Sequence, residues 1–176
     1  IFDPMAVLKS LMEAAAPDAL FIFEVPGFDG LISRGRFDQV FHQHLQYFSH
    51  GSFVNMLEKA GGQFLLHQEN YHDWGAMAIA FKRSDKRETP RPKIKPPSLG
   101  GIRLRYKMFE CQMATVRETL AALDGSRIYG YGAAQMLPVL AYHIGNNLDC
   151  LTAVLDDDPD KDGLGYWNLP VKIMPS

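Results

Sequence analysis

The chain has 176 residues, of which 47% are hydrophobic, 11% aromatic and 22% charged, and this composition excludes a disordered or fibrous protein. The formal net charge is −2, and the basic middle, with ten Lys/Arg against five Asp/Glu in residues 84–145, is too dilute to indicate a nucleic-acid partner. No stretch approaches the roughly 18 apolar residues of a membrane span. The cysteines, Cys111 and Cys150, form no CxxC pair. We therefore expect a cytoplasmic protein without a disulfide framework or a membrane anchor.

Helices and strands are expected to alternate through the first half. Asp3-Pro4 is typical of a helix start, and Pro17 ends the apolar periodicity that follows it. Residues 20–25 are nearly all apolar, which predicts a strand buried on both faces of a parallel sheet, followed by a loop. Beyond the loop we expect a helix over residues 52–60 and strands over 63–69 and 76–82. These elements form half of an α/β sheet with an antiparallel pair at one edge.

A linker and a second set of elements follow. Residues 84–100 hold four of the eleven prolines and five of the eighteen basic residues, a composition that predicts an extended linker. After it we expect a helix (102–123), a strand ending in a glycine turn (127–131), a helix (133–144) and a buried strand (150–155) that ends in an acidic turn. This order is typical of a small nucleotide-binding, doubly wound fold. The predicted parts are therefore residues 1–83, the linker 84–100 and a Rossmann-like domain over 101–176.

Three of the six histidines fall within residues 42–50, just after the first predicted strand. Open α/β sheets bind ligands beyond the carboxyl ends of their strands. His42 and His44, two apart, would project to the same side of an extended segment, and an imidazole that titrates near neutral pH favours a general base. A metal site is disfavoured, because two histidines leave a transition metal one or two ligands short and no Cys or carboxylate stands at matching spacing. The alternative is that these are loop histidines that only satisfy backbone groups.

The second candidate site is the turn Gly130-Tyr131-Gly132-Ala133-Ala134. Its glycines would let backbone amides approach a phosphate, and the following helix N-terminus would add the positive end of a dipole. Asp156, 24 residues after Gly132 and at the end of the next strand, is placed to accept hydrogen bonds from ribose hydroxyls. Gln135 takes the place of the third glycine of GxGxxG, and residues 156–158 are equally compatible with a solvated turn.

These motifs, in this order, resemble the sugar C-methyltransferases that use S-adenosylmethionine. The resemblance rests on Glu24-Val25-Pro26, Phe41-His42-Gln43-His44-Leu45-Gln46-Tyr47-Phe48-Ser49, Gly130–Ala134 and Asp156-Asp157-Asp158-Pro159-Asp160-Lys161-Asp162-Gly163. It implies an α/β fold: the C-terminal half of a class I methyltransferase-like sheet, followed by a small Rossmann-like C-methyltransferase C-terminal domain. It also implies that the glycine loop for S-adenosylmethionine lies upstream of Ile1, so that the chain is a fragment without activity of its own.

The resemblance assigns roles residue by residue. His44 matches the general base that deprotonates the carbon next to the carbonyl of a nucleotide-activated sugar, and no metal is implied. The neighbouring motif positions are His42, Gln43 and Tyr47, and the acceptor-binding positions are Gly130, Tyr131, Gly132, Ala133 and Asp156. Two positions depart from the family. Gln43 replaces a Glu and cannot stabilise an imidazolium by charge, and Phe41 replaces a Tyr and lacks its hydroxyl.

Two other functions remain open from the sequence. The first is a non-catalytic module that binds a nucleotide or nucleotide sugar through Gly130, Gly132 and Asp156. The second is a metal-dependent hydrolase built on His42 and His44.

Overall fold

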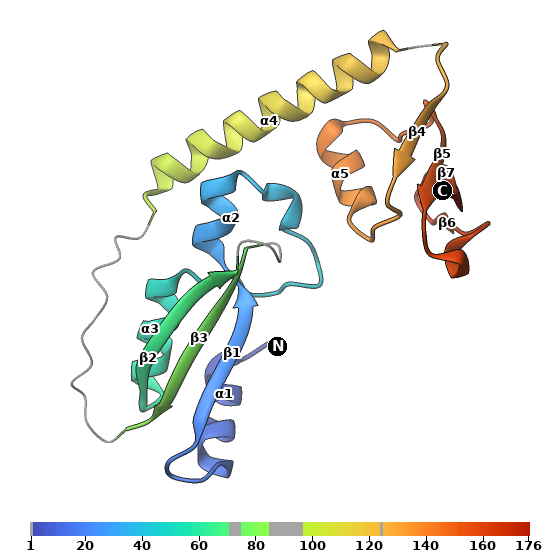
Figure 1. Cartoon of the computed structure of the whole chain (residues 1–176). Helices are drawn as coiled ribbons and strands as arrows, with labels where there is room; N and C mark the ends of the chain where they lie inside the picture. Colours follow the sequence, from blue (N-terminus) through green and yellow to red (C-terminus); the bar gives the residue numbers. More distant parts are fainter. Residues whose placement is uncertain (1, 71–74, 85–96, 124) are drawn as a thin grey trace. The chain divides into compact units, whose positions relative to one another are not determined.

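The chain forms two units, Ile1–Arg103 and Leu104–Ser176, in a computed structural model that describes residues 2–70, 75–84, 97–123 and 125–176 (Figure 1). Each unit has its own sheet and its own hydrophobic core. The predicted linker, residues 84–100, lies largely outside the described residues. Its last two residues, Leu99 and Gly100, already belong to a helix.

The first unit contains a three-stranded sheet in the order β1-β3-β2, formed by β1 (Leu20–Pro26), β2 (Gly62–Asn70) and β3 (Ala76–Arg83). β3 runs antiparallel to both neighbours. The predicted antiparallel pair at one edge is therefore confirmed. The prediction that the first strand is buried on both faces of a parallel sheet is wrong for the described residues, because β1 pairs there with antiparallel β3 alone. Leu20 and Ile22 are exposed, on the face opposite the core residues Phe21 and Phe23.

One face of this sheet is covered by α1 (Pro4–Ala14) and α3 (His50–Lys59) (Figure 1). The Asp3 carboxylate caps α1 by accepting the Ala6 N–H at 2.9 Å, and the Ser49 hydroxyl caps α3 by accepting the Ser52 N–H at 3.1 Å. Both helices turn their apolar sides to alternate residues of β3. The resulting core contains Leu8, Met12, Phe53, Leu57, Met77, Ile79 and Phe81.

The segment predicted as a loop after β1 contains a short helix, α2 (Phe28–Arg34), and a single 3-10 turn, Phe37–Gln39. Gly35 ends α2 in the left-handed conformation with φ of 64°. The start of α2 lies close to the end of the β2–β3 hairpin, where the Gly27 N–H donates to the Gly75 carbonyl at 3.2 Å. A Cβ on Gly27 would lie 2.6 Å from that carbonyl oxygen, so this approach requires glycine.

The second unit contains a four-stranded sheet in the order β4-β5-β7-β6. Its elements are α4 (Leu99–Ala122, which begins before the unit boundary), β4 (Ile128–Tyr131), α5 (Leu137–Ile144), β5 (Leu151–Asp156), β6 (Gly165–Tyr166) and β7 (Leu169–Pro175). β4, β5 and β7 are parallel, and β6 is antiparallel to β7. The predicted α4, β4 and β5 are confirmed, and the two units together show the predicted α/β class. β6 and β7 were not predicted, and α5 begins at Leu137 rather than at Ala133.

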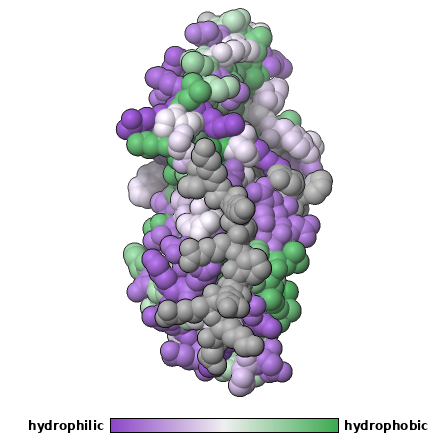
Figure 2. Space-filling model, turned by 90° about the vertical axis from the view of Figure 1, so that its left-hand side faces the viewer, coloured by the Kyte–Doolittle hydropathy of each residue, from purple (hydrophilic) through white to green (hydrophobic). Residues whose placement is uncertain are grey.

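The surface is mixed. On the face shown in Figure 2, the coloured residues are mostly hydrophilic and the hydrophobic ones gather in separate patches. None of the described helices has the length and apolar character needed to cross a bilayer. Cys111 and Cys150 are both free thiols.

Candidate functional site

Three contacts hold the histidine segment at the carboxyl end of β1. The Phe28 N–H donates to the Phe48 carbonyl at 2.8 Å, and the Asp29 carboxylate accepts the His50 N–H at 2.7 Å. Gly27 and Phe48 form a parallel β-bridge. The start of α2 and the start of α3 therefore fix both the path and the end of the segment.

Within the segment, residues 41–44 form a turn. The His44 N–H donates to the Phe41 carbonyl at 3.1 Å. The expectation that His42 and His44 project together from an extended segment is therefore wrong, because a turn does not alternate its side chains as a strand does. His42 is exposed, whereas His44 is partly buried.

The His44 imidazole contacts two aromatic rings. Its centroid is 4.7 Å from that of Phe41 and 6.0 Å from that of Tyr47, with interplanar angles of 60° and 80°. The Nδ1 atom of His44 is buried and has no hydrogen-bond partner among the described residues. The structure thus brings the predicted residues His44 and Tyr47 together beside Phe41. His42 and Gln43 are exposed on the turn, with the His42 ring centroid 5.9 Å from that of Phe41.

An ion pair between Arg36 and Asp38 precedes this turn. The Arg36 guanidinium donates to both carboxylate oxygens of Asp38, at 2.9 and 2.8 Å, and the Gln39 amide donates to the same carboxylate at 2.9 Å. Burial raises the pKa of Asp38, but the hydrogen bonds from Arg36 and Gln39 outweigh it and hold the pKa below its ordinary value. Asp38 is therefore ionised at neutral pH and orders the backbone that leads to Phe41. The only sequence signal for this pair is the spacing Arg-x-Asp in a glycine-containing segment.

A different pair of histidines stacks where the first residue of α3 meets β2. His50 is 3% exposed, and its ring stacks on that of His67 in β2 with centroids 4.0 Å apart and an interplanar angle of 20°. Both ring nitrogens of His50 and the Nε2 of His67 are buried without hydrogen-bond partners among the described residues. Burial, and then repulsion by His67, lowers the pKa of His50. His50 is thus a structural group of the first unit, separate from the His44 turn.

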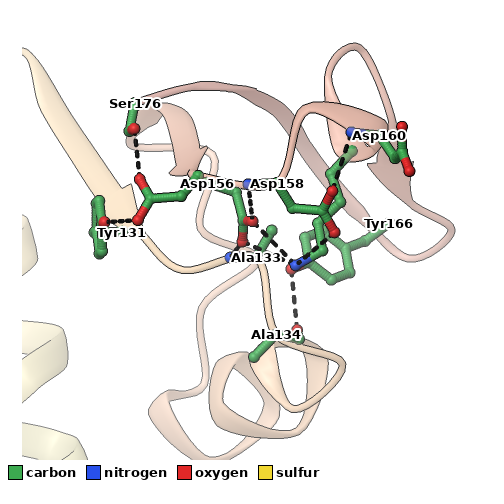
Figure 3. Close-up of polar contacts among 10 residues, drawn as sticks. Tyr131, Ala133, Ala134, Asp156, Asp158, Asp160, Tyr166 and Ser176 are labelled. Atoms are coloured by element: carbon green, nitrogen blue, oxygen red, sulfur yellow. Dashed lines mark hydrogen bonds and ion pairs between the residues drawn. The ribbon is translucent and has the colours of Figure 1, made fainter.

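In the second unit, the glycine turn uses its own N–H groups internally (Figure 3). The Gly132 N–H donates to the Leu155 carbonyl at 2.7 Å, and the Ala134 N–H donates to the Gly132 carbonyl at 2.9 Å. The Ala133 N–H donates to the Asp156 carboxylate at 2.6 Å. Gly132 has φ of 89°, which explains why glycine stands there. In this conformation these three amides offer no donor to a phosphate, and the helix that would add its dipole begins only at Leu137.

Asp156 is the centre of this network (Figure 3). Besides the Ala133 amide, its carboxylate accepts the Asp158 N–H at 3.0 Å and the Lys161 ammonium at 3.0 and 3.1 Å. The amides of Asp158 and Ala133, and then Lys161, hold the pKa of Asp156 below its ordinary value. Both oxygens are engaged within the chain. The geometry therefore favours a structural role for Asp156, which links the turn after β4 to the end of β5, over binding of a ribose.

Tyr131, a member of the predicted binding set, has 71% of its surface exposed. Its hydroxyl donates to the Asp157 carboxylate at 2.6 Å, and the Ser176 hydroxyl donates to the other oxygen of that carboxylate at 2.6 Å. Its role in binding stays a prediction. Over the described ranges, no group of three His, Cys, Asp or Glu is arranged to hold a metal ion.

Comparison with known proteins adds one relation. No protein-family model matches this chain. The C-methyltransferase NovU of Streptomyces niveus is 31% identical to it over 144 residues, a match that covers 74% of this chain and 34% of the relative. The chain therefore spans about a third of the length of that protein. The match supports a relation to C-methyltransferases and, in general terms, to methyl transfer.

Proposed function

We propose that this chain is the C-terminal part of a C-methyltransferase that uses S-adenosylmethionine, with His44 as the general base. The observation that carries the proposal is the match to a C-methyltransferase over 74% of the chain. Two further features support it: His44 lies just beyond the carboxyl end of a strand, where α/β sheets bind ligands, and its ring is held in place by Phe41 and Tyr47.

The proposed chemistry begins with a carbon acid. His44 takes a proton from the carbon next to the acceptor's carbonyl, and the electron pair of that C–H bond passes into an enolate. S-adenosylmethionine, when bound, would supply the methyl group: its S–CH3 bond would break as the new bond to carbon forms, and S-adenosylhomocysteine would leave. The amides of the Gly132 turn are not available to the methyl donor, because they are engaged within the chain. The proposal therefore places binding of the methyl donor in a part of the protein outside this chain, and predicts that the chain alone is inactive.

The acceptor we propose is a small molecule, a nucleotide-activated sugar, as the resemblance to sugar C-methyltransferases implies. We propose no nucleic-acid partner for this protein. We also propose that it acts in the cytoplasm. Titration calorimetry of the 176-residue chain with S-adenosylmethionine should give no binding. Micromolar affinity would contradict the proposed division of the donor site.

Substitution of the base tests the reaction itself. In the full-length enzyme, His44→Ala should lower turnover by roughly 10²–10⁴-fold, the usual contribution of a positioned acid–base group, with the affinity for S-adenosylmethionine unchanged. Exchange of the acceptor's carbon-bound hydrogen with deuterated solvent should vanish as well. His42→Ala is the matched control, since His42 is exposed on the same turn and should have a much smaller effect. Equal and small effects of both substitutions, each with a lower melting temperature, would indicate histidines that only order a loop.

The alternative, a nucleotide-binding module without chemistry, has weaker support from the contacts of the second unit. Its phosphate site would need the N–H groups of Gly132, Ala133 and Ala134. These groups already donate hydrogen bonds to Leu155, Asp156 and Gly132, respectively. Slower hydrogen exchange of the amides of residues 130–134 on addition of a nucleoside diphosphate would restore this alternative.

A further inference from the structure

We infer that Tyr47 is a positioning residue for His44, acting through the backbone and ring of Phe41 rather than on the substrate. The inference rests on the proposed role of His44 as the base. It assigns a task to a hydroxyl that the resemblance places among the site residues without showing what it does.

The Tyr47 hydroxyl both donates and accepts a hydrogen bond within the chain. It donates its proton to the Gln39 carbonyl at 2.9 Å and accepts the Phe41 N–H at 3.1 Å. A tyrosine hydroxyl has one proton to donate. Because that proton is given to a backbone carbonyl, Tyr47 has none left for an enolate oxygen in this conformation.

The two groups that Tyr47 joins belong to the backbone on which His44 is mounted. Gln39 ends the 3-10 turn and is 8% exposed, and its side chain is held by Asp38. Phe41 accepts the His44 N–H through its carbonyl at 3.1 Å and packs its ring against the imidazole at 4.7 Å. The hydroxyl thus connects the rigid turn at Gln39 to the residue that holds both the backbone and the ring of His44.

Loss of this hydroxyl would leave the Gln39 carbonyl and the Phe41 amide without their partner. A partly buried backbone group that loses its hydrogen bond either stays unpaired, at a cost in free energy, or moves to reach water. Either result frees the Phe41 ring and, with it, the His44 imidazole. A base displaced by about an ångström from its proton loses much of its rate advantage.

The first test needs no catalysis and uses the 176-residue chain. In Tyr47→Phe, the Phe41 amide should exchange with solvent roughly ten-fold faster, as expected for loss of one hydrogen bond of ordinary strength, and the ring signals of His44 should shift in the NMR spectrum. Tyr129→Phe is the matched control, because Tyr129 is 46% exposed and its hydroxyl should bear on neither signal. Unchanged exchange at Phe41 and unchanged His44 signals in Tyr47→Phe would overturn the inference.

The second test asks whether Tyr47 acts through His44. In the full-length enzyme, Tyr47→Phe should lower kcat by roughly ten-fold with little change in the KM for either substrate, but should cause no further loss when His44 is already Ala. A further ten-fold loss in the His44→Ala background would show that Tyr47 acts on the substrate itself, and would overturn the inference. If His44→Ala proves as active as the unmodified enzyme, the proposed function fails, and the exchange and NMR measurements alone decide whether Tyr47 positions His44.

Discussion

Acid should destabilise the first unit through His50, because this imidazole is buried in its neutral form. His50 is 3% exposed, and burial followed by repulsion from His67 lowers its pKa below the ordinary value of 6.5. The charges of Asp29 and Glu69 raise the pKa of His50, but by less than burial and His67 lower it. The unfolded chain therefore binds a proton at His50 at a higher pH than the folded chain does. Stability then falls as the pH drops below about 6.5.

The size of the effect has an upper limit that follows from linkage. If His50 stays neutral in the folded state from pH 7.5 to 5.5, a group with an unfolded pKa of 6.5 costs about 1.4 kcal/mol of unfolding free energy over that interval. Partial protonation of the folded state, or access of water to the ring, lowers this figure. We therefore expect a loss of up to about 1.4 kcal/mol that is due to His50 alone.

Urea unfolding at pH 7.5 and pH 5.5, followed by the NMR signals of buried Ile79 and Phe81, measures this loss for the first unit. His50→Phe keeps an aromatic ring between Phe64 and His67 and should reduce the loss between the two pH values by up to the same 1.4 kcal/mol. The control is Gln46→Ala, which lies in the exposed segment before α3, changes no titratable group and should leave the pH dependence unchanged. An identical pH dependence in His50→Phe and the unmodified chain would refute the reasoning.

Two further substitutions test the fold. Gly27→Ala would place its Cβ 2.6 Å from the Gly75 carbonyl oxygen and should cost about 1–3 kcal/mol in urea unfolding, whereas Gly51→Ala, with nothing within 4 Å, should not destabilise. Asp156→Asn should lower the melting temperature of the second unit at pH 7 much more than Asp162→Asn, since Asp156 accepts hydrogen bonds from both Ala133 and Lys161. Because the pKa of Asp156 is held below 3.8, this difference should persist to about pH 4 and disappear only below the lowered pKa. Equal melting temperatures of the two Asp variants at pH 7 would contradict the structural role of Asp156.

Local signals in the sequence were sufficient for many of the helices and strands. Asp3-Pro4 predicted the start of α1, because an acceptor followed by proline satisfies the first amides of a helix. The strongly helical composition of residues 102–123 likewise predicted α4. The seven-residue α2 was missed, since Gly30 lies in its middle and its stability comes from contacts with the hairpin rather than from its own composition.

The candidate site was predictable only in its location. That the histidines follow a strand is evident from the sequence, but the turn at residues 41–44 depends on the Tyr47 hydroxyl meeting a backbone eight residues earlier. Similarly, Asp156 was expected to face a ligand, yet it binds the Ala133 amide 23 residues away along the chain. Such pairings are decided by tertiary structure. In the sequence, an acidic residue at a strand end is equally compatible with binding a ligand and with binding the chain's own backbone.

The exposed face of the first sheet has a consequence for how this chain behaves in solution. Ile22 and Leu66, 69% and 61% exposed, lie on either side of Ala80 in the strand register, and among the described residues β1 has no second strand partner. An aliphatic row next to an open strand edge is a surface on which β-rich proteins self-associate. We therefore expect this face of the first sheet to promote self-association, and light scattering should show association that grows with protein concentration.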